Sequence, residues 1–160
     1  MADVRNGPIE SAWKSIETVR VSCNDYLAER GMDRDIIDAV SMSLTELLEN
    51  AVKFSEPATN SVEYSITINS KLIMIEVKNT LARNQDYHLD RLEKTVQWLR
   101  GFHNSFEAFY ERLREVSMIA MDNHSDSGLG LARIAYEGRC IVDFYVNSDS
   151  VIAVSAVYQL

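Results

Sequence analysis

The hydrophobic residues of this chain change their spacing along the sequence, and these changes limit what the chain can fold into. Within residues 33–54 apolar side chains recur every three or four positions, as on one face of a helix. Within residues 61–79 they alternate with polar ones, which is typical of two strands joined by a tight turn at Asn69 and Ser70. From about residue 86 the helical spacing returns. The pattern therefore predicts a fold that combines helices with a β-hairpin.

Residues that begin and end helices divide the chain into further segments. Pro8 suits the first turn of a helix that ends near Gly31, and Asp33 suits the N-cap of the next helix. The predicted helices are 8–30, 33–54, two within 86–117 and 129–138, and the predicted strands are 61–69, 71–79, 139–146 and 150–158. This order predicts an α+β fold, a two-layer α/β sandwich whose mostly antiparallel sheet carries helices on one face.

Length and charge limit the number of domains and the classes of partner. The 160 residues, 46% of them hydrophobic, predict a single domain over residues 1–160. The net charge is −8 and the basic residues form no cluster, which argues against nucleic acid and membrane as partners. Apolar runs are short and the first residues lack a signal-peptide pattern, so we expect a cytoplasmic protein.

Three polar residues share one face of the predicted helix over residues 33–54. Glu46, Asn50 and Lys53 follow one another at helical spacing. The carboxylate of Glu46 suits a general base, the amide oxygen of Asn50 a ligand of Mg²⁺, and the ammonium of Lys53 a phosphate contact. A solvated helix face with a Glu49–Lys53 ion pair explains the same residues, and this helix taken alone favours that explanation.

A glycine-containing segment opens the predicted helix near residue 129. Gly128 and Gly130 allow a tight turn and a close approach of the backbone to a ligand. The N–H groups of Gly128, Leu129, Gly130 and Leu131 then lie at the positive end of a helix, which is a common way to bind phosphate. The glycines alone are a weak signal, and the signal is stronger when it is combined with Glu46 and Asn50.

These two motifs resemble a known superfamily. The segment from Glu46 to Phe54 resembles the N box, and the segment from Gly128 to Ile134 the second glycine box, of the GHKL (histidine-kinase-like) ATPases, which include the anti-sigma-factor serine kinases. The resemblance implies a Bergerat-type ATPase fold that binds Mg-ATP. In that family Glu46 matches the general base, Asn50 the Mg²⁺ ligand, Lys53 a phosphate-side residue, and Gly128 and Gly130 the lid hinge at the phosphates.

The adenine end of the site departs from the superfamily. An Asp-x-Gly-x-Gly box normally follows the second hairpin strand, and its Asp accepts a hydrogen bond from adenine. Here Asn79 stands in place of the Asp and Leu81 in place of a glycine, and no glycine lies between Gly31 and Gly101. The side-chain oxygen of Asn79 still accepts a hydrogen bond. A degenerate first glycine box and a helical insert at about residues 86–117 resemble the SiaB-like subgroup of regulatory kinases.

Two functions from different classes remain open. The first is an ATP-dependent serine kinase that phosphorylates a small STAS-type antagonist protein in a bacterial partner-switching pathway. The alternative is a catalytically inactive scaffold of the same fold that binds and sequesters a protein partner without ATP. The aromatic row of the insert, Phe102, Phe106, Phe109 and Tyr110, is typical of a core, with a partner-binding groove or a homodimer face as the alternative.

Overall fold

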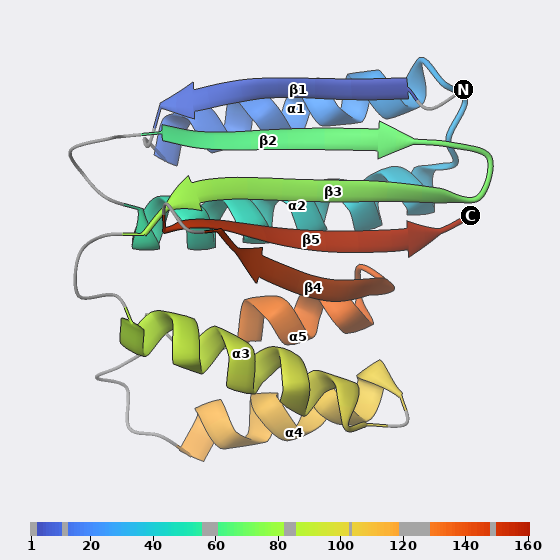
Figure 1. Cartoon of the computed structure of the whole chain (residues 1–160). Coiled ribbons are helices and arrows are strands. Elements are labelled where there is room, and N and C mark those ends of the chain that lie inside the picture. Colours follow the sequence, from blue (N-terminus) through green and yellow to red (C-terminus); the bar gives the residue numbers. More distant parts are fainter. Residues whose placement is uncertain are drawn as a thin grey trace.

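A five-stranded antiparallel sheet organises the part of the chain that the computed structural model describes, which is residues 3–10, 13–55, 61–81, 86–102, 104–118, 129–147 and 150–160. Its strands are β1 (Asp3–Glu10), β2 (Ser61–Ile68), β3 (Leu72–Thr80), β4 (Cys140–Val146) and β5 (Val151–Gln159). They lie in the order β1-β2-β3-β5-β4, and every neighbouring pair is antiparallel (Figure 1).

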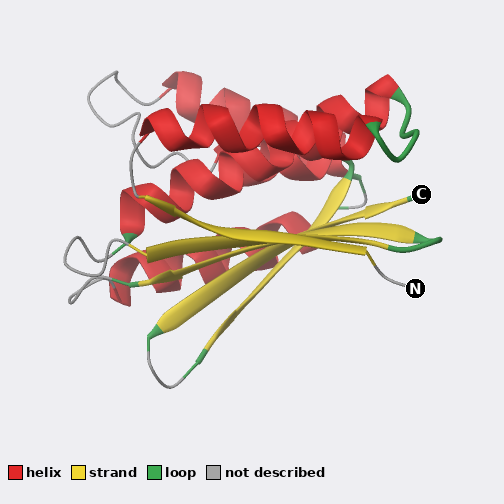
Figure 2. Ribbon diagram, turned by 90° about the horizontal axis from the view of Figure 1, so that it is seen from above, coloured by secondary structure: helices red, strands yellow, loops and turns green. Residues whose placement is uncertain are grey.

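The helices are α1 (Trp13–Ala28), α2 (Arg34–Phe54), α3 (Asp86–Arg100), α4 (Ser105–Met118) and α5 (Leu129–Tyr136). In Figure 1, α1 and α2 lie behind the sheet, while α3 and α4 lie beyond its β4 edge, next to α5. Figure 2 shows the twist of the sheet, with most of the helices on one side of it. The predicted α+β fold with a two-layer arrangement is confirmed. No described helix is long and apolar enough to cross a membrane.

The core lies between α2 and the sheet, as the two hydrophobic periods require. α2 buries a stripe that includes Val40, Leu44, Leu47, Leu48 and Ala51. Every second residue of β3 is buried, and these residues share the face that α2 covers. α2 therefore presents its apolar stripe to the middle of the sheet, which places its remaining polar residues at the border of the core.

The start of the first helix was predicted wrongly. Residues 3–10 form strand β1, and α1 begins at Trp13, whereas the sequence predicted a helix from residue 8. Pro8 lies in β1 opposite Glu63 of β2, and β1 is an edge strand with one neighbour. An edge strand accepts proline because only one side of its backbone must bond to a neighbouring strand. Proline was therefore compatible with either structure.

The segment over residues 86–117 forms the two predicted helices, but their predicted packing is only partly right. In α3, Val96 is buried, and Leu92 and Leu99 pack against the core. In α4, Phe106 and Tyr110 of the aromatic row are exposed, although such a row is typical of a core, and so is Leu113. α4 instead buries Ala108 and packs against α5, where Tyr136 contacts the rings of Phe106 and Phe109.

Candidate functional site

A cavity of about 280 Å³ lies where α2, α3, α5 and the sheet meet. Five elements supply its walls, with α2 and α3 contributing most of the side chains. The polar and charged residues that line it are Glu46, Glu49, Asn50, Lys53, Asn79, His88, Arg91 and Thr95. The cavity is therefore mostly apolar at its sheet side, where Asn79 is the polar residue, and it carries charges of both signs along α2 and α3.

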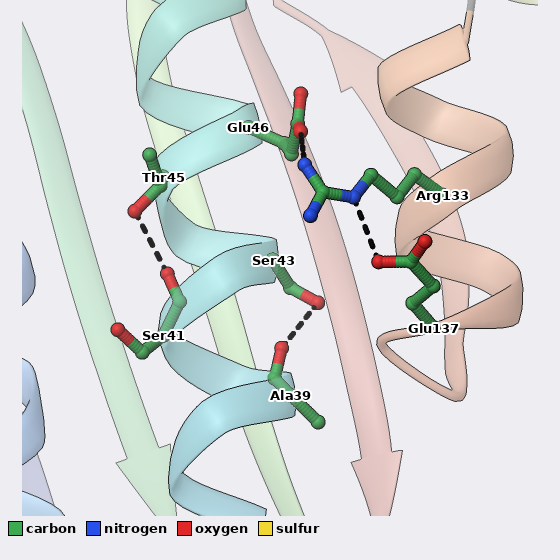
Figure 3. Close-up of polar contacts among 7 residues, drawn as sticks. All are labelled: Ala39, Ser41, Ser43, Thr45, Glu46, Arg133 and Glu137. Carbon is green, nitrogen blue, oxygen red and sulfur yellow. Dashed lines mark hydrogen bonds and ion pairs between the residues drawn. The ribbon is translucent and has the colours of Figure 1, made fainter.

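Glu46 is held by an arginine from the far end of the sequence. Nη1 of Arg133 donates a hydrogen bond to Oε1 of Glu46 at 2.9 Å, and Nε of Arg133 donates to Oε2 of Glu137 at 2.8 Å (Figure 3). The side chain of Glu46 is 18% exposed and that of Arg133 is 43% exposed. The two bonds raise the pKa of Arg133, with the bond to Glu137 the largest cause. The guanidinium therefore joins α2 to α5.

Gly130 brings α5 directly against α2. A Cβ atom added at Gly130 would lie 2.7 Å from Oε2 of Glu46, and the next α2 side chain, Asn50, is 3.9 Å from that position. A side chain at this position would displace the Glu46 carboxylate. The glycine is thus needed for a close approach between the first turn of α5 and the two polar residues of α2.

The remaining α2 residues lie along the same cavity. Asn50 and Lys53 line it, as does Glu49. Lys53 forms no ion pair with Glu49 among the described contacts, and its ammonium lies 5.1 Å from the centroid of the Phe54 ring. Burial raises the pKa of Glu49, the nearby charge of Glu46 raises it further, and Arg133 partly offsets both effects. Two carboxylates, one amide and one ammonium therefore share a small volume.

Asn79 and Leu81 lie at the sheet side of the cavity. Asn79 is 5% exposed and lies on the helix-covered face of β3, while Leu81 also lines the cavity. Leu89, Leu92 and Thr95 of α3 complete this wall. The insert thus supplies part of the cavity wall through α3, and a volume of about 280 Å³ is near the lower limit of ordinary ligand pockets.

The structure brings together six of the eight predicted site residues. Glu46, Asn50, Lys53, Asn79, Gly130 and Leu131 all line the cavity. Leu129 is the first residue of α5 and does not line the cavity. Gly128 lies outside the described residues. The roles of these residues in binding a nucleotide remain predictions.

The oxygen atoms available to a metal are few. Among the described residues, no group of three or more His, Cys, Asp and Glu side chains is placed to hold a metal ion. The amide oxygen of Asn50 and the carboxylate of Glu46 are hard donors of the type that Mg²⁺ prefers. In proteins Mg²⁺ commonly binds through one or two protein groups together with phosphate and water. The donor set therefore fits Mg²⁺ that enters with phosphates.

Sequence patterns did not indicate Arg133. It lies 87 residues from Glu46, so that only the packing of α5 on α2 brings the two together. The available signal was its place within the glycine-containing segment, three residues after Gly130, with an acidic residue four positions later. That spacing indicated a surface ion pair with Glu137 and gave no reason to expect a contact with α2.

Comparison with known proteins gives a match in fold. No protein-family model matches the chain, and no curated protein sequence matches it. A chain in the crystal structure of the SiaB–SiaC complex from Pseudomonas aeruginosa is similar, with a TM-score of 0.65 and 18% sequence identity. The match covers 99% of this chain and 89% of that one. At this identity the similarity concerns the fold, and membership of the SiaB-like subgroup stays a prediction.

Proposed function

We propose that this protein is an ATP-dependent serine kinase that acts on a protein partner in a bacterial partner-switching pathway. The observation that supports the proposal best is that Gly130, Glu46 and Asn50 line one cavity with no room for a side chain at Gly130, because two motifs that resemble nucleotide-binding boxes meet there. The similar fold of a chain in the SiaB–SiaC complex, which is a complex of two proteins, supports a protein partner for this chain as well.

The residues around the cavity suit phosphoryl transfer. The serine oxygen of the partner would form a bond to the γ-phosphorus of ATP while the bond from that phosphorus to the bridging oxygen breaks and ADP leaves. Glu46 would orient the hydroxyl and accept its proton. The N–H groups at the start of α5 and the ammonium of Lys53 would stabilise the phosphate charge. Mg²⁺ held by Asn50 would supply further charge neutralisation when it is bound.

Two measurements test this proposal. Titration calorimetry with Mg-ATP should show binding, and transfer of labelled γ-phosphate to the co-purified partner should depend on Glu46. Glu46→Ala should lower the transfer rate by about two to four orders of magnitude because it removes the general base. Glu63→Ala, which removes an exposed carboxylate of β2, is the matched control and should leave the rate unchanged. Equal rates in both variants would contradict the assignment of Glu46.

Specific observations favour a second function, a scaffold that binds its partner without ATP. Leu81 and α3 form part of the wall of a cavity of only about 280 Å³, and Glu46 is already paired with Arg133. α4 exposes Phe106 and Tyr110, with 53% and 55% of each residue accessible, and aromatic residues are common anchors in protein interfaces. Under this function Mg-ATP gives no heat of binding, and Glu46→Ala leaves the partner complex intact.

A further inference from the structure

Arg133 bonds to the carboxylate that the proposed function needs as a proton acceptor. Glu46 lines the cavity and also accepts a hydrogen bond from Arg133. Arg133 does not line the cavity itself and is connected to it through the Glu46 carboxylate. The bond from Arg133 occupies Oε1 of Glu46, so this oxygen is less available to a substrate hydroxyl.

The bond between Arg133 and Glu46 is of a kind that an incoming phosphate can replace. It is a single hydrogen bond through one nitrogen, and the Arg133 side chain is 43% exposed. Half-exposed ion pairs of this kind contribute little to stability. A phosphate offers anionic oxygens, two of which a planar guanidinium can bind with two parallel bonds. Arg133 would therefore gain more from phosphate than it loses at Glu46.

The place of Arg133 in α5 keeps it near the residues where phosphates would bind. Its Nε bond to Glu137, which follows the last residue of α5, holds the arginine stem against that helix (Figure 3). Gly130, which precedes Arg133 by less than one turn, lines the cavity and lies close to Glu46. A phosphate at the start of α5 would thus lie within about one helical turn of Arg133.

We propose that Arg133 has two alternative partners, Glu46 and the phosphates of the nucleotide, and that phosphate binding draws it away from Glu46. This inference rests on the proposed nucleotide site. Its consequence is that Oε1 of Glu46 is released to a substrate hydroxyl only when phosphate is bound. Arg133 would then contact the nucleotide as well as control the position of Glu46.

The test compares ATP with adenosine, which lacks phosphates, in a background that has no charge at position 46. Calorimetry would give both dissociation constants for the wild type, Glu46→Gln, and Glu46→Gln combined with Arg133→Gln. Glu46→Gln alone should tighten ATP binding a few fold because it removes the competing carboxylate. Adding Arg133→Gln should then lower the preference for ATP over adenosine by about tenfold, with adenosine affinity unchanged.

The Glu46→Gln background matters because removing Arg133 from the wild type would leave an unpaired carboxylate that itself repels phosphate. A purely structural Arg133 would change both affinities equally in this background, and an unchanged ATP-to-adenosine ratio would overturn the proposal. Arg100→Gln is the matched control, since Arg100 pairs with Asp143 of β4 and does not line the cavity. It removes the same charge and should leave the ratio unchanged.

Further outcomes separate a failure of this inference from a failure of the proposed function. If the double variant does not fold, Glu46→Gln combined with Arg133→Lys keeps the positive charge and loses the planar fork. It should lower the ATP preference by about threefold, and no fall would overturn the proposal. A wild type that binds neither ATP nor adenosine would overturn the proposed function together with this inference. ATP binding with an unchanged ratio in the variants would overturn the exchange of partners alone.

Discussion

Two glycines on one short segment have different reasons to lack a side chain. A Cβ at Gly138 would lie 2.2 Å from Oγ of Ser43 and 2.5 Å from the backbone oxygen of Ile134. Ser43 is buried, and its hydroxyl donates to the carbonyl of Ala39 at 2.8 Å, so it has little room to move (Figure 3). At Gly130 the nearest atom is instead the end of the Glu46 side chain.

This difference predicts that two alanine substitutions change the free energy of unfolding by different amounts. Gly138→Ala should lower the free energy of unfolding by about 1–3 kcal/mol because the new methyl group has no space. Gly130→Ala should change it by less than about 1 kcal/mol, because the better helix propensity of alanine offsets the displacement of Glu46. Urea unfolding followed by circular dichroism measures both. A larger loss for Gly130→Ala than for Gly138→Ala would show that the contact between α5 and Glu46 supports the fold.

The raised pKa of Glu49 predicts a dependence of stability on pH. Because burial raises its folded-state pKa above the unfolded value of about 4.3, the stability it contributes is fully present below that value. That contribution is lost as the pH rises through the higher folded-state pKa. Glu49→Gln should therefore unfold at a higher denaturant concentration than the wild type at pH 7, and the difference should shrink towards pH 4. A difference that stays constant from pH 4 to 7 would contradict this.

The candidate site shows which residue roles can be predicted from a sequence. Glu46, Asn50 and Lys53 were predicted together because helical spacing alone places them on one face. Gly130 was predicted as a loop glycine for a ligand, whereas its contact with Glu46 depends on how α5 packs on α2. Arg133 was missed for the same reason, since no local rule relates it to Glu46. Local spacing thus predicts faces of helices, and contacts between helices need the fold.

α4 buries a small residue and exposes large aromatic ones. Ala108 is fully buried against α5 while the larger Tyr110 is 55% exposed. Ala108→Leu should therefore lower the free energy of unfolding by about 1–3 kcal/mol through overpacking. Tyr110→Ser, at an exposed position, should change it by about 0.5 kcal/mol or less. Thermal unfolding of both variants tests the orientation of the helix, and the reverse ranking would show that α4 turns its aromatic face inward.

The elements were predicted well where a long stretch keeps one period. α2 and the β2–β3 hairpin match their predicted bounds closely because burial on one side imposes the spacing over many residues. β1 was missed because residues 3–10 include Gly7 and Pro8 and show no clear alternation. The aromatic row of α4 has the helical spacing of a core helix, but hydrophobic spacing does not say which side of a helix finds a neighbour.

The two cysteines can report whether the chain unfolds as one unit. Cys23 of α1 and Cys140 of β4 are both buried in the same core, and burial raises their pKa values to about 12 and about 11. Neither thiol should react with a disulfide reagent at pH 8 until the protein opens.

Because the two cysteines lie towards opposite edges of the sheet, their labelling rates compare the stabilities of those edges. Mass spectrometry of the two labelled peptides should give equal rates that fall together as the protein is stabilised. A Cys140 that reacts much faster than Cys23 would show that β4 and α5 open separately from the rest of the core.

The position of β5 also has a consequence for how the protein is made. β5 follows the other four strands of the described sheet in the order of synthesis, yet it lies inside the sheet, between β3 and β4. Until residues 151–159 leave the ribosome, β3 keeps one edge unpaired, and β4 has no strand to join. Until then, α2 and the β2–β3 hairpin of the nascent chain stay incompletely covered. We therefore expect ribosome-associated chaperones to bind the nascent chain.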